Sequence, residues 1–193
     1  YTDMHGNRQY YDDQTDNYMQ THYQLHAVQQ FTDKWSGSMA LHYTRGKGYY
    51  EQYKESDNLT DYGLPPVEID DTLINIGSVT YEAMDSTITQ SDIVRQKWLD
   101  NHFYGFTYAT TYETPVVALT LGGAWNQYDG DHFGNIVWSE WVSLNEHDYE
   151  WYFNNGKKTD FNSYAKANYN LTTAVRFFGD VQYRYIDYKL HGI

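Results

Sequence analysis

The stretch MQTHYQLHAVQQF, residues 19–31, decides the fold because its side chains change character at every step. One alternate set is Met19, Thr21, Tyr23, Leu25, Ala27, Gln29 and Phe31, and the other set is polar apart from Val28. A period of two places the two sets on opposite faces of a β-strand. Such a strand is about twice the usual length in soluble proteins. The sequence therefore predicts a long strand with one apolar and one polar face.

The same pattern returns after a short link. Residues 35–44 alternate in the same way, and only Thr32, Asp33 and Lys34 separate them from the first run. Two long strands joined by so short a link are typical of an antiparallel hairpin. We expect two further hairpins, one from residues 102–112 and 117–125 and one from residues 161–171 and 175–185.

The second hairpin also carries a register signal. Its bulky side chains occupy even positions before the turn and odd positions after it, which requires an even-numbered loop. We therefore expect Tyr112 opposite Val117, which places Tyr108 opposite Leu121, Tyr104 opposite Trp125 and Phe106 over Gly123. In the third hairpin, which turns near Thr172 and Thr173, Lys166 is expected directly or diagonally across from Asp180.

The apolar faces of all six expected strands lack Asp, Glu, Lys and Arg, although one residue in five of the chain is charged. A Lys or Arg facing lipid at the bilayer midplane costs roughly 2 to 4 kcal/mol, so a lipid-facing stripe should be free of charge. The connections alternate too: three or four residues at one end, and residues 45–101 and 128–160 at the other. Short turns at one end and long loops at the other are typical of outer-membrane barrels. Aromatic side chains at the strand ends match the expected girdles, with Trp35, Tyr112 and Tyr169 near the turns and Tyr43, Tyr104, Trp125 and Tyr185 near the loops.

Composition excludes several classes of protein. Asp and Glu number 26 against 13 Lys and Arg, a balance that argues against binding nucleic acid. The uncharged stretches are too short for a membrane-spanning helix, and a chain that is 19% aromatic is not typical of disorder. The absence of cysteine excludes disulfides and thiolate metal sites. No Gly-x-Ser-x-Gly, His-Glu-x-x-His or phosphate-binding glycine loop is present, so we expect no enzyme activity.

Six strands are too few for a barrel with an open lumen, since the smallest barrels have about eight. We therefore expect residues 1–193 to be a partial outer-membrane β-barrel whose remaining strands lie outside this chain. Studied alone, such a piece would have two unpaired edges and should self-associate or pack differently. A wetted lumen is expected to be lined by the polar row His22, His26, His42, Lys166, Arg176, Asp180 and Arg184.

Six stretches resemble the barrel of TonB-dependent receptors of Bacteroides-type bacteria. They are residues 16–26 (DNYMQTHYQLH), 40–50 (ALHYTRGKGYY), 92–106 (DIVRQKWLDNHFYGF), 119–134 (LTLGGAWNQYDGDHFG), 154–168 (NNGKKTDFNSYAKAN) and 182–188 (QYRYIDY). The resemblance implies a 22-stranded barrel with an N-terminal plug that imports a large scarce nutrient such as a siderophore, haem, cobalamin or glycan. It also implies energy from the inner-membrane TonB complex, acting through a plug segment that is not in this sequence, and contact with outer-membrane lipid.

Two other functions are open from the sequence. A soluble carbohydrate-binding β domain would use loop aromatics as its platform, and a passive porin would lack the plug. Ligand contact in the extracellular loops is assigned to eight aromatic residues, which could equally pack the loops together: Tyr49, Tyr50, Tyr53, Trp138, Trp141, Tyr149, Trp151 and Tyr152.

No cofactor or metal site is expected. Asp129, Asp131, Asp70 and Asp71 could bind calcium, but their spacing is not that of a calcium loop, and solvated loop charge is the simpler reading. His22 and His26 would be about 13 Å apart on a strand, too far to share one metal ion.

Overall fold

The computed structural model describes residues 5–7, 11, 15–69, 74–76, 79–81, 86–141 and 149–192. Six long strands form one antiparallel up-and-down sheet in the order β1-β2-β7-β8-β9-β10. The strands are β1 (Asp16–Thr32), β2 (Trp35–Asn58), β7 (Gln90–Glu113), β8 (Val117–Ser139), β9 (Tyr149–Asn170) and β10 (Arg176–Gly192). This confirms the all-β, up-and-down arrangement of three long hairpins.

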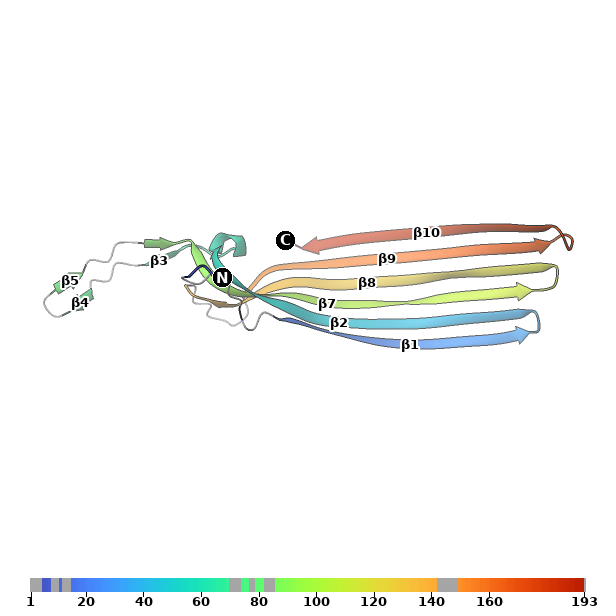
Figure 1. Ribbon diagram of the computed structural model, residues 1–193, viewed down its shortest axis with the longest axis horizontal. Coiled ribbons are helices and arrows are strands. Elements are labelled where there is room, and N and C mark those ends of the chain that lie inside the picture. Colours follow the sequence, from blue (N-terminus) through green and yellow to red (C-terminus); the bar gives the residue numbers. More distant parts are fainter. Residues whose placement is uncertain are drawn as a thin grey trace.

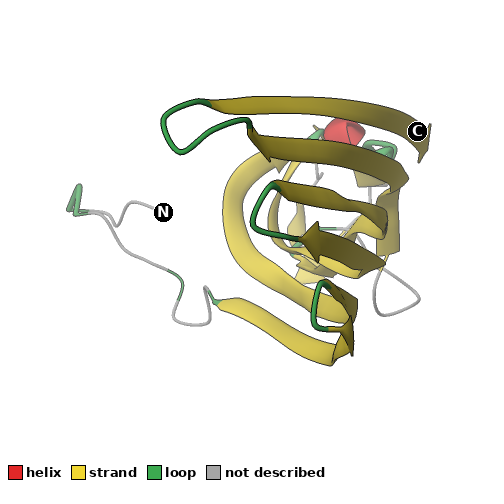
Figure 2. Ribbon diagram, turned by 90° about the vertical axis from the view of Figure 1, so that its right-hand side faces the viewer, coloured by secondary structure: helices red, strands yellow, loops and turns green. Residues whose placement is uncertain are grey.

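The sheet is elongated and curved. Figure 1 shows the short turns together at one end and the longer connections at the other. Figure 2 shows the sheet bending without closing, and β1 and β10 are the outermost strands of the strand order. Among the described residues, no helix is both long enough and apolar enough to cross a membrane.

The strands are much longer than expected. The sequence pattern predicts loops at residues 45–101 and 128–160. In the structure β2 continues to Asn58 and β7 begins at Gln90. Likewise β8 continues to Ser139 and β9 begins at Tyr149. The apolar alternation ends near Tyr43 because charged side chains take over on the same face, whereas the backbone pairing does not depend on them. A hydrophobic pattern therefore marks where the apolar surface ends and not where the strand ends.

The longest connection, between β2 and β7, contains the single-turn helix η1 (Leu59–Tyr62) and two short strand pairs. The strand β3 (Val67–Ile69) pairs with β6 (Ser86–Ile88), and β4 (Ile74–Ile76) pairs with β5 (Val79–Tyr81). The sequence pattern also suggests extra strands within residues 70–81 or residues 136–142. β4 and β5 lie in the first segment. In the second segment, residues 136–139 are the end of β8 and not a separate strand, and residue 142 lies outside the described residues.

The register of the first hairpin agrees with the sequence pattern, with Leu25 opposite Leu41 and Tyr23 opposite Tyr43. Its turn is shorter than expected, because Thr32 belongs to β1 and pairs with Trp35 across a register shift. In the third hairpin Lys166 lies directly opposite Asp180.

The register predicted for the second hairpin is wrong by two residues. Tyr112 faces Leu119 rather than Val117, and the tyrosine over Gly123 is Tyr108. Consequently Tyr104 lies opposite Gln127, Tyr108 is not opposite Leu121, and Phe106 lies opposite Trp125. The cause is the turn. The Thr114 N–H donates to the Val117 carbonyl (2.7 Å) and Thr114 Oγ1 accepts from the Val117 N–H (3.0 Å), which closes a loop of only Pro115 and Val116.

A small hydrophobic cluster, called here the loop core, lies where the long connections meet the sheet. It is formed by the buried residues Leu59, Tyr62, Leu64, Ile93 and Ile136, with Val67, Tyr149 and Trp151 against them. Leu59, Ile93 and Ile136 have no exposed surface. The loop core fixes the first part of the β2–β7 connection against β7, β8 and β9.

Candidate functional site: a two-faced sheet with aromatic bands and a charged belt

Strand register assigns every sheet residue to one of two faces. The apolar face, defined by Leu25, Leu41, Leu119 and Phe177, runs unbroken across all six strands. These four side chains are 64%, 41%, 44% and 57% exposed. Among the described elements, the long strands make contacts with their sheet neighbours and with η1, so no second layer covers this face. A water-soluble sheet would bury such a surface.

Aromatic residues bound the apolar face at both ends. On five of the six strands, two aromatic residues of this face are eight positions apart: Tyr23 and Phe31, Trp35 and Tyr43, Tyr104 and Tyr112, Phe161 and Tyr169, and Phe177 and Tyr185. On β8 the corresponding positions are Val117 and Trp125. No charged residue of this face lies between them. Eight residues span about 26 Å along a strand, or about 20 Å at a tilt near 40°, close to the height of an outer-membrane apolar band.

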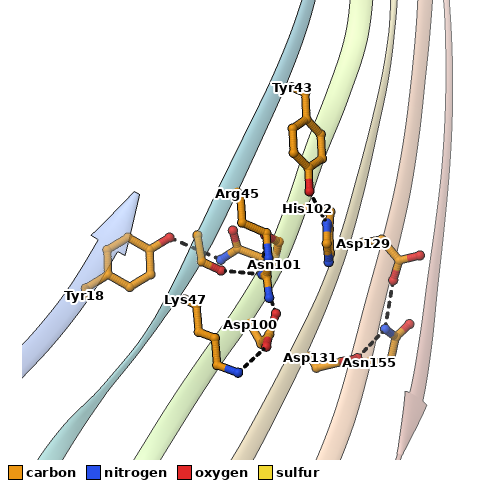
Figure 3. Close-up of polar contacts among 11 residues, drawn as sticks. Tyr18, Tyr43, Arg45, Lys47, Asp100, Asn101, His102, Asp129, Asp131 and Asn155 are labelled. Atoms are coloured by element: carbon orange, nitrogen blue, oxygen red, sulfur yellow. Dashed lines mark hydrogen bonds and ion pairs between the residues drawn. The ribbon is translucent and has the colours of Figure 1, made fainter. Parts of the chain in front are cut away.

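Immediately beyond the loop-side aromatics the same face becomes charged (Figure 3). The residues of this charged belt that Figure 3 labels are Arg45 and Lys47 on β2, Asp100 and His102 on β7, Asp129 and Asp131 on β8, and Asn155 on β9. The strand register adds Lys157 on β9 and Asp187 and Lys189 on β10.

Belt residues of β2, β7, β8 and β9 are paired across neighbouring strands, whereas Lys189 pairs with Asp187 of its own strand, β10, at 3.3 Å. Asp100 forms ion pairs with Arg45 and with Lys47, the latter at 3.2 Å. Hydrogen bonding connects Tyr43 of the aromatic band to His102 of the belt, with 2.8 Å between Oη and Nδ1. This hydrogen bond joins the charged belt to the loop-side aromatic residues of the same face.

The carboxylates Asp129 and Asp131, weighed above as calcium ligands, are partnered within the belt. Asn155 Nδ2 donates to Oδ1 of Asp129 (2.9 Å) and of Asp131 (2.7 Å), and Lys157 Nζ lies 3.3 Å from Asp129. Within the described residues no group of three or more His, Cys, Asp or Glu side chains is arranged to hold a metal ion. Asp70 and Asp71 lie outside the described residues.

The opposite, polar face contains all seven residues assigned to a lumen: His22, His26, His42, Lys166, Arg176, Asp180 and Arg184. His22 Nδ1 is 3.0 Å from Thr44 Oγ1, and Arg184 Nε donates to Asp160 Oδ1 (3.1 Å). Thr44 on β2 is only 8% exposed, whereas polar-face residues of the outermost strands, such as Val28 on β1, are largely exposed. That the polar face lines a channel is a prediction from the sequence.

Tyrosines lie over glycines along the polar face. A Cβ added to Gly122 would lie 2.5 Å from the Tyr164 ring, and one added to Gly134 would lie 2.3 Å from the Tyr152 ring. Both glycines are directly opposite these tyrosines in the β8–β9 register. Only glycine leaves room for the ring, so the rings cover the backbone of the neighbouring strand.

The structure does not bring the eight aromatic ligand candidates together. Tyr49, Tyr53 and Trp138 lie on the apolar side of the extended strands, Tyr50 and Tyr152 lie on the polar face, Tyr149 and Trp151 pack in the loop core, and Trp141 follows β8. Tyr49 packs against Trp98 with 4.5 Å between ring centroids, and the Tyr53 hydroxyl donates to Asp92. The packing role is thus visible for Tyr49, Tyr149 and Trp151.

Tyr62 in the loop core gives a pH prediction. Its hydroxyl donates to Asp57 Oδ2 (2.6 Å) and accepts from Arg95 Nη1 (2.9 Å), and burial followed by the Asp57 contact raises its pKa from 10.0 to about 12. An unfolded Tyr62 would lose its proton first, so its contribution to stability is complete below about pH 10 and is lost as the pH rises to about 12.

We expect Tyr62→Phe to remove a late-titrating tyrosine from the absorbance titration at 295 nm. The curve near pH 10 should be unchanged relative to the parent protein. If the variant instead lost a group titrating near pH 10, the hydroxyl would not be held by Asp57 and Arg95 as described.

Sequence reasoning missed the charged belt. Its signal was present, because Arg45 and Lys47 keep the parity of Leu41 and Tyr43, and Asp129 and Asp131 keep that of Trp125. Extending the alternation past the last apolar residue would have found it.

Compared with known proteins, the chain matches no protein-family model and no curated protein at a significant level. The two faces of the sheet, and the aromatic and charged residues that bound the apolar face, are therefore the features that bear on function.

Proposed function

We propose that this chain forms six strands of the β-barrel of a TonB-dependent outer-membrane transporter, which imports a large scarce nutrient through a plugged lumen. The observation that carries the proposal is the uncovered apolar face, free of charge between aromatic residues eight positions apart. Hydrocarbon is the surrounding that stabilises such a face, with aromatic side chains at the two interfaces.

The charged belt supports the same placement. It lies on the apolar face at the loop end only, so the two ends of the sheet differ. We infer that the belt stands at the headgroup level on the outside of the cell, with the short turns on the periplasmic side.

The open edges support a larger barrel. β1 and β10 each have one neighbour in the sheet, and six strands cannot enclose a lumen. In this proposal further strands pair with β1 and β10, the polar face lines the passage, and the TonB complex supplies energy through a plug.

The lipid-facing assignment is tested with two adjacent residues on opposite faces. Leu41 lies on the apolar face and Ala40 on the polar face, and the chain has no native cysteine. A bimane fluorophore is attached to Leu41→Cys or to Ala40→Cys in the intact protein, reconstituted with brominated phospholipid.

We expect strong quenching of the fluorophore at position 41 and little at position 40. Equal, weak quenching at both positions would reject the membrane placement and favour a soluble β domain. Steady conductance in planar bilayers, in the absence of the TonB complex, would favour a passive porin over a plugged transporter.

A further inference from the structure

A pocket opens on the polar face where β1, β2 and β7 extend beyond the loop-side aromatic residues. Its volume is about 300 Å³, at the lower end of the range for small-molecule sites. It is called here the edge pocket, because β1 is the outermost strand on this side of the sheet. The polar-face residues that line it are Asp16, Tyr18, Gly48, Tyr50, Lys97 and Leu99.

The first row of the edge pocket has opposite charges at its two ends. Tyr50 on β2 lies directly opposite Asp16 on β1 and directly opposite Lys97 on β7. Two strand spacings separate the charged residues, so their Cα atoms are about 9.5 Å apart. A carboxylate and an ammonium group therefore flank one aromatic ring.

The second row is apolar and has a gap in its middle. Gly48 lies directly between Tyr18 and Leu99, which are 42% and 38% exposed although they belong to the polar face. A Cβ on Gly48 would lie 2.1 Å from the Asn17 carbonyl oxygen, so only glycine fits there. The gap between the tyrosine and the leucine can take an apolar side chain of a ligand.

Neither charge of the first row is neutralised within the described part of the chain, where Asp16 and Lys97 form no ion pair. The described polar-face residues beside Lys97 include no carboxylate: Gly48, Tyr50, Gln52, Arg95, Leu99, His132 and Gly134. Those beside Asp16 include no Lys or Arg: Tyr18, Gly48, Tyr50 and Gln52. Lys97 is also half-buried, so an anion brought to its ammonium group would replace lost hydration.

We propose that the edge pocket binds a short peptide with free ends, its ammonium group on Asp16 and its carboxylate on Lys97. Two or three extended residues span at most about 7 to 11 Å, which matches the separation of the two charges. A free amino acid carries both charged groups on one carbon atom and is too short to reach both. This inference goes beyond the proposed transport function, because the site binds such a peptide whatever the barrel imports.

The test uses the tripeptide alanyl-leucyl-alanine in three forms: with free ends, acetylated at the amino end, and amidated at the carboxyl end. Binding to the intact protein is measured by calorimetry. We expect the free form to bind at least about tenfold more tightly than either blocked form, because each block removes one charged group. The affinity of the free form should fall as salt rises.

Two variants locate the two ends of the peptide. Lys97→Met should weaken binding of the free form about tenfold, and amidation should then cost no more than about twofold, because its partner is already absent. Asp16→Asn should act in the same way on acetylation. The matched control is Lys158→Met, which removes a lysine of the same face on β9, outside the edge pocket, and should bind as the parent protein does.

Equal affinity for free and blocked forms, no binding of the free form at millimolar concentration, or an equal loss in Lys158→Met would overturn the inference. An undiminished cost of amidation in Lys97→Met would overturn it too, since the carboxylate would then lie elsewhere. None of these results would alter the fluorophore quenching at positions 41 and 40. Failure of the peptide assignment is therefore distinguishable from failure of the membrane assignment.

Discussion

Replacing Val181 by arginine should destabilise the protein in a bilayer by about 2 to 4 kcal/mol, while the same change at Val28 should cost under about 1 kcal/mol. Val181 is midway between the aromatic residues Phe177 and Tyr185 on the apolar face, which places it near the middle of the apolar band. Val28 lies on the polar face of β1. Both are exposed, at 67% and 80%, so water alone would tolerate both substitutions.

The measurement is urea-induced unfolding of the intact protein from lipid vesicles, with Val181→Arg and Val28→Arg compared at equal lipid content. The difference between the two variants is the informative quantity, since each adds the same side chain. If the two arginines had equal effects in vesicles, the apolar face would not contact hydrocarbon. Repeating the comparison with Val181→Leu checks that a change of size alone is tolerated.

Replacing Leu59 by alanine should destabilise the loop core by about 2 to 5 kcal/mol. Leu59 has no exposed surface and packs with Tyr62, Ile93 and Ile136 where the β2–β7 connection meets the sheet. The loss of stability should be local, because the other contacts of each long strand are with the strands beside it in the sheet. We therefore expect the connection to open while the sheet stays paired.

Hydrogen exchange separates these two outcomes. The amides of Leu59 and Leu64, which donate to Thr89 and Leu59 carbonyls, should exchange faster by a factor of a hundred or more in Leu59→Ala. Amides in the middle of β7 and β8 should keep their protection. The control is Leu171→Ala, a residue 52% exposed at the turn end, which should leave both sets unchanged. Equal exchange in the parent protein and in Leu59→Ala would show that the connection is not held by this cluster.

Local alternation was enough to predict the three hairpins and both faces. Each strand repeats the period of two over many residues, so Leu25, Leu41 and Phe177 could be assigned to one face without any knowledge of tertiary contacts. The register of the second hairpin, between β7 and β8, could not be predicted in the same way. Hairpins that differ by two residues have identical parity, and the choice was made by the Thr114 side chain closing on Val117.

Strand length and the loop core were also beyond the sequence pattern. The sequence pattern is an alternation of apolar and polar side chains. This alternation ends at the charged belt, although the backbone pairing of the strands continues beyond it. The loop core joins Leu59 to Ile136, which are far apart in sequence. Aromatic content alone does not distinguish Tyr149 and Trp151, which pack in the loop core, from Tyr152 and Tyr188, which line a groove on the polar face of β8, β9 and β10. Long-range contacts of this kind leave no local periodicity.

The extension of β2 from Tyr43 to Asn58 adds about 50 Å of paired strand beyond the loop-side aromatic band. If the lower part of the sheet stands in a membrane, this portion forms a stiff collar that raises the entrance well clear of the headgroups. Hydrogen-bonded pairing of β2 with β7 continues along this portion to Asn58, with one register shift between Lys54 and Asp57. Under the proposed transport function, an incoming solute would then meet the side chains of this paired wall well before it reaches the depth of the lipid.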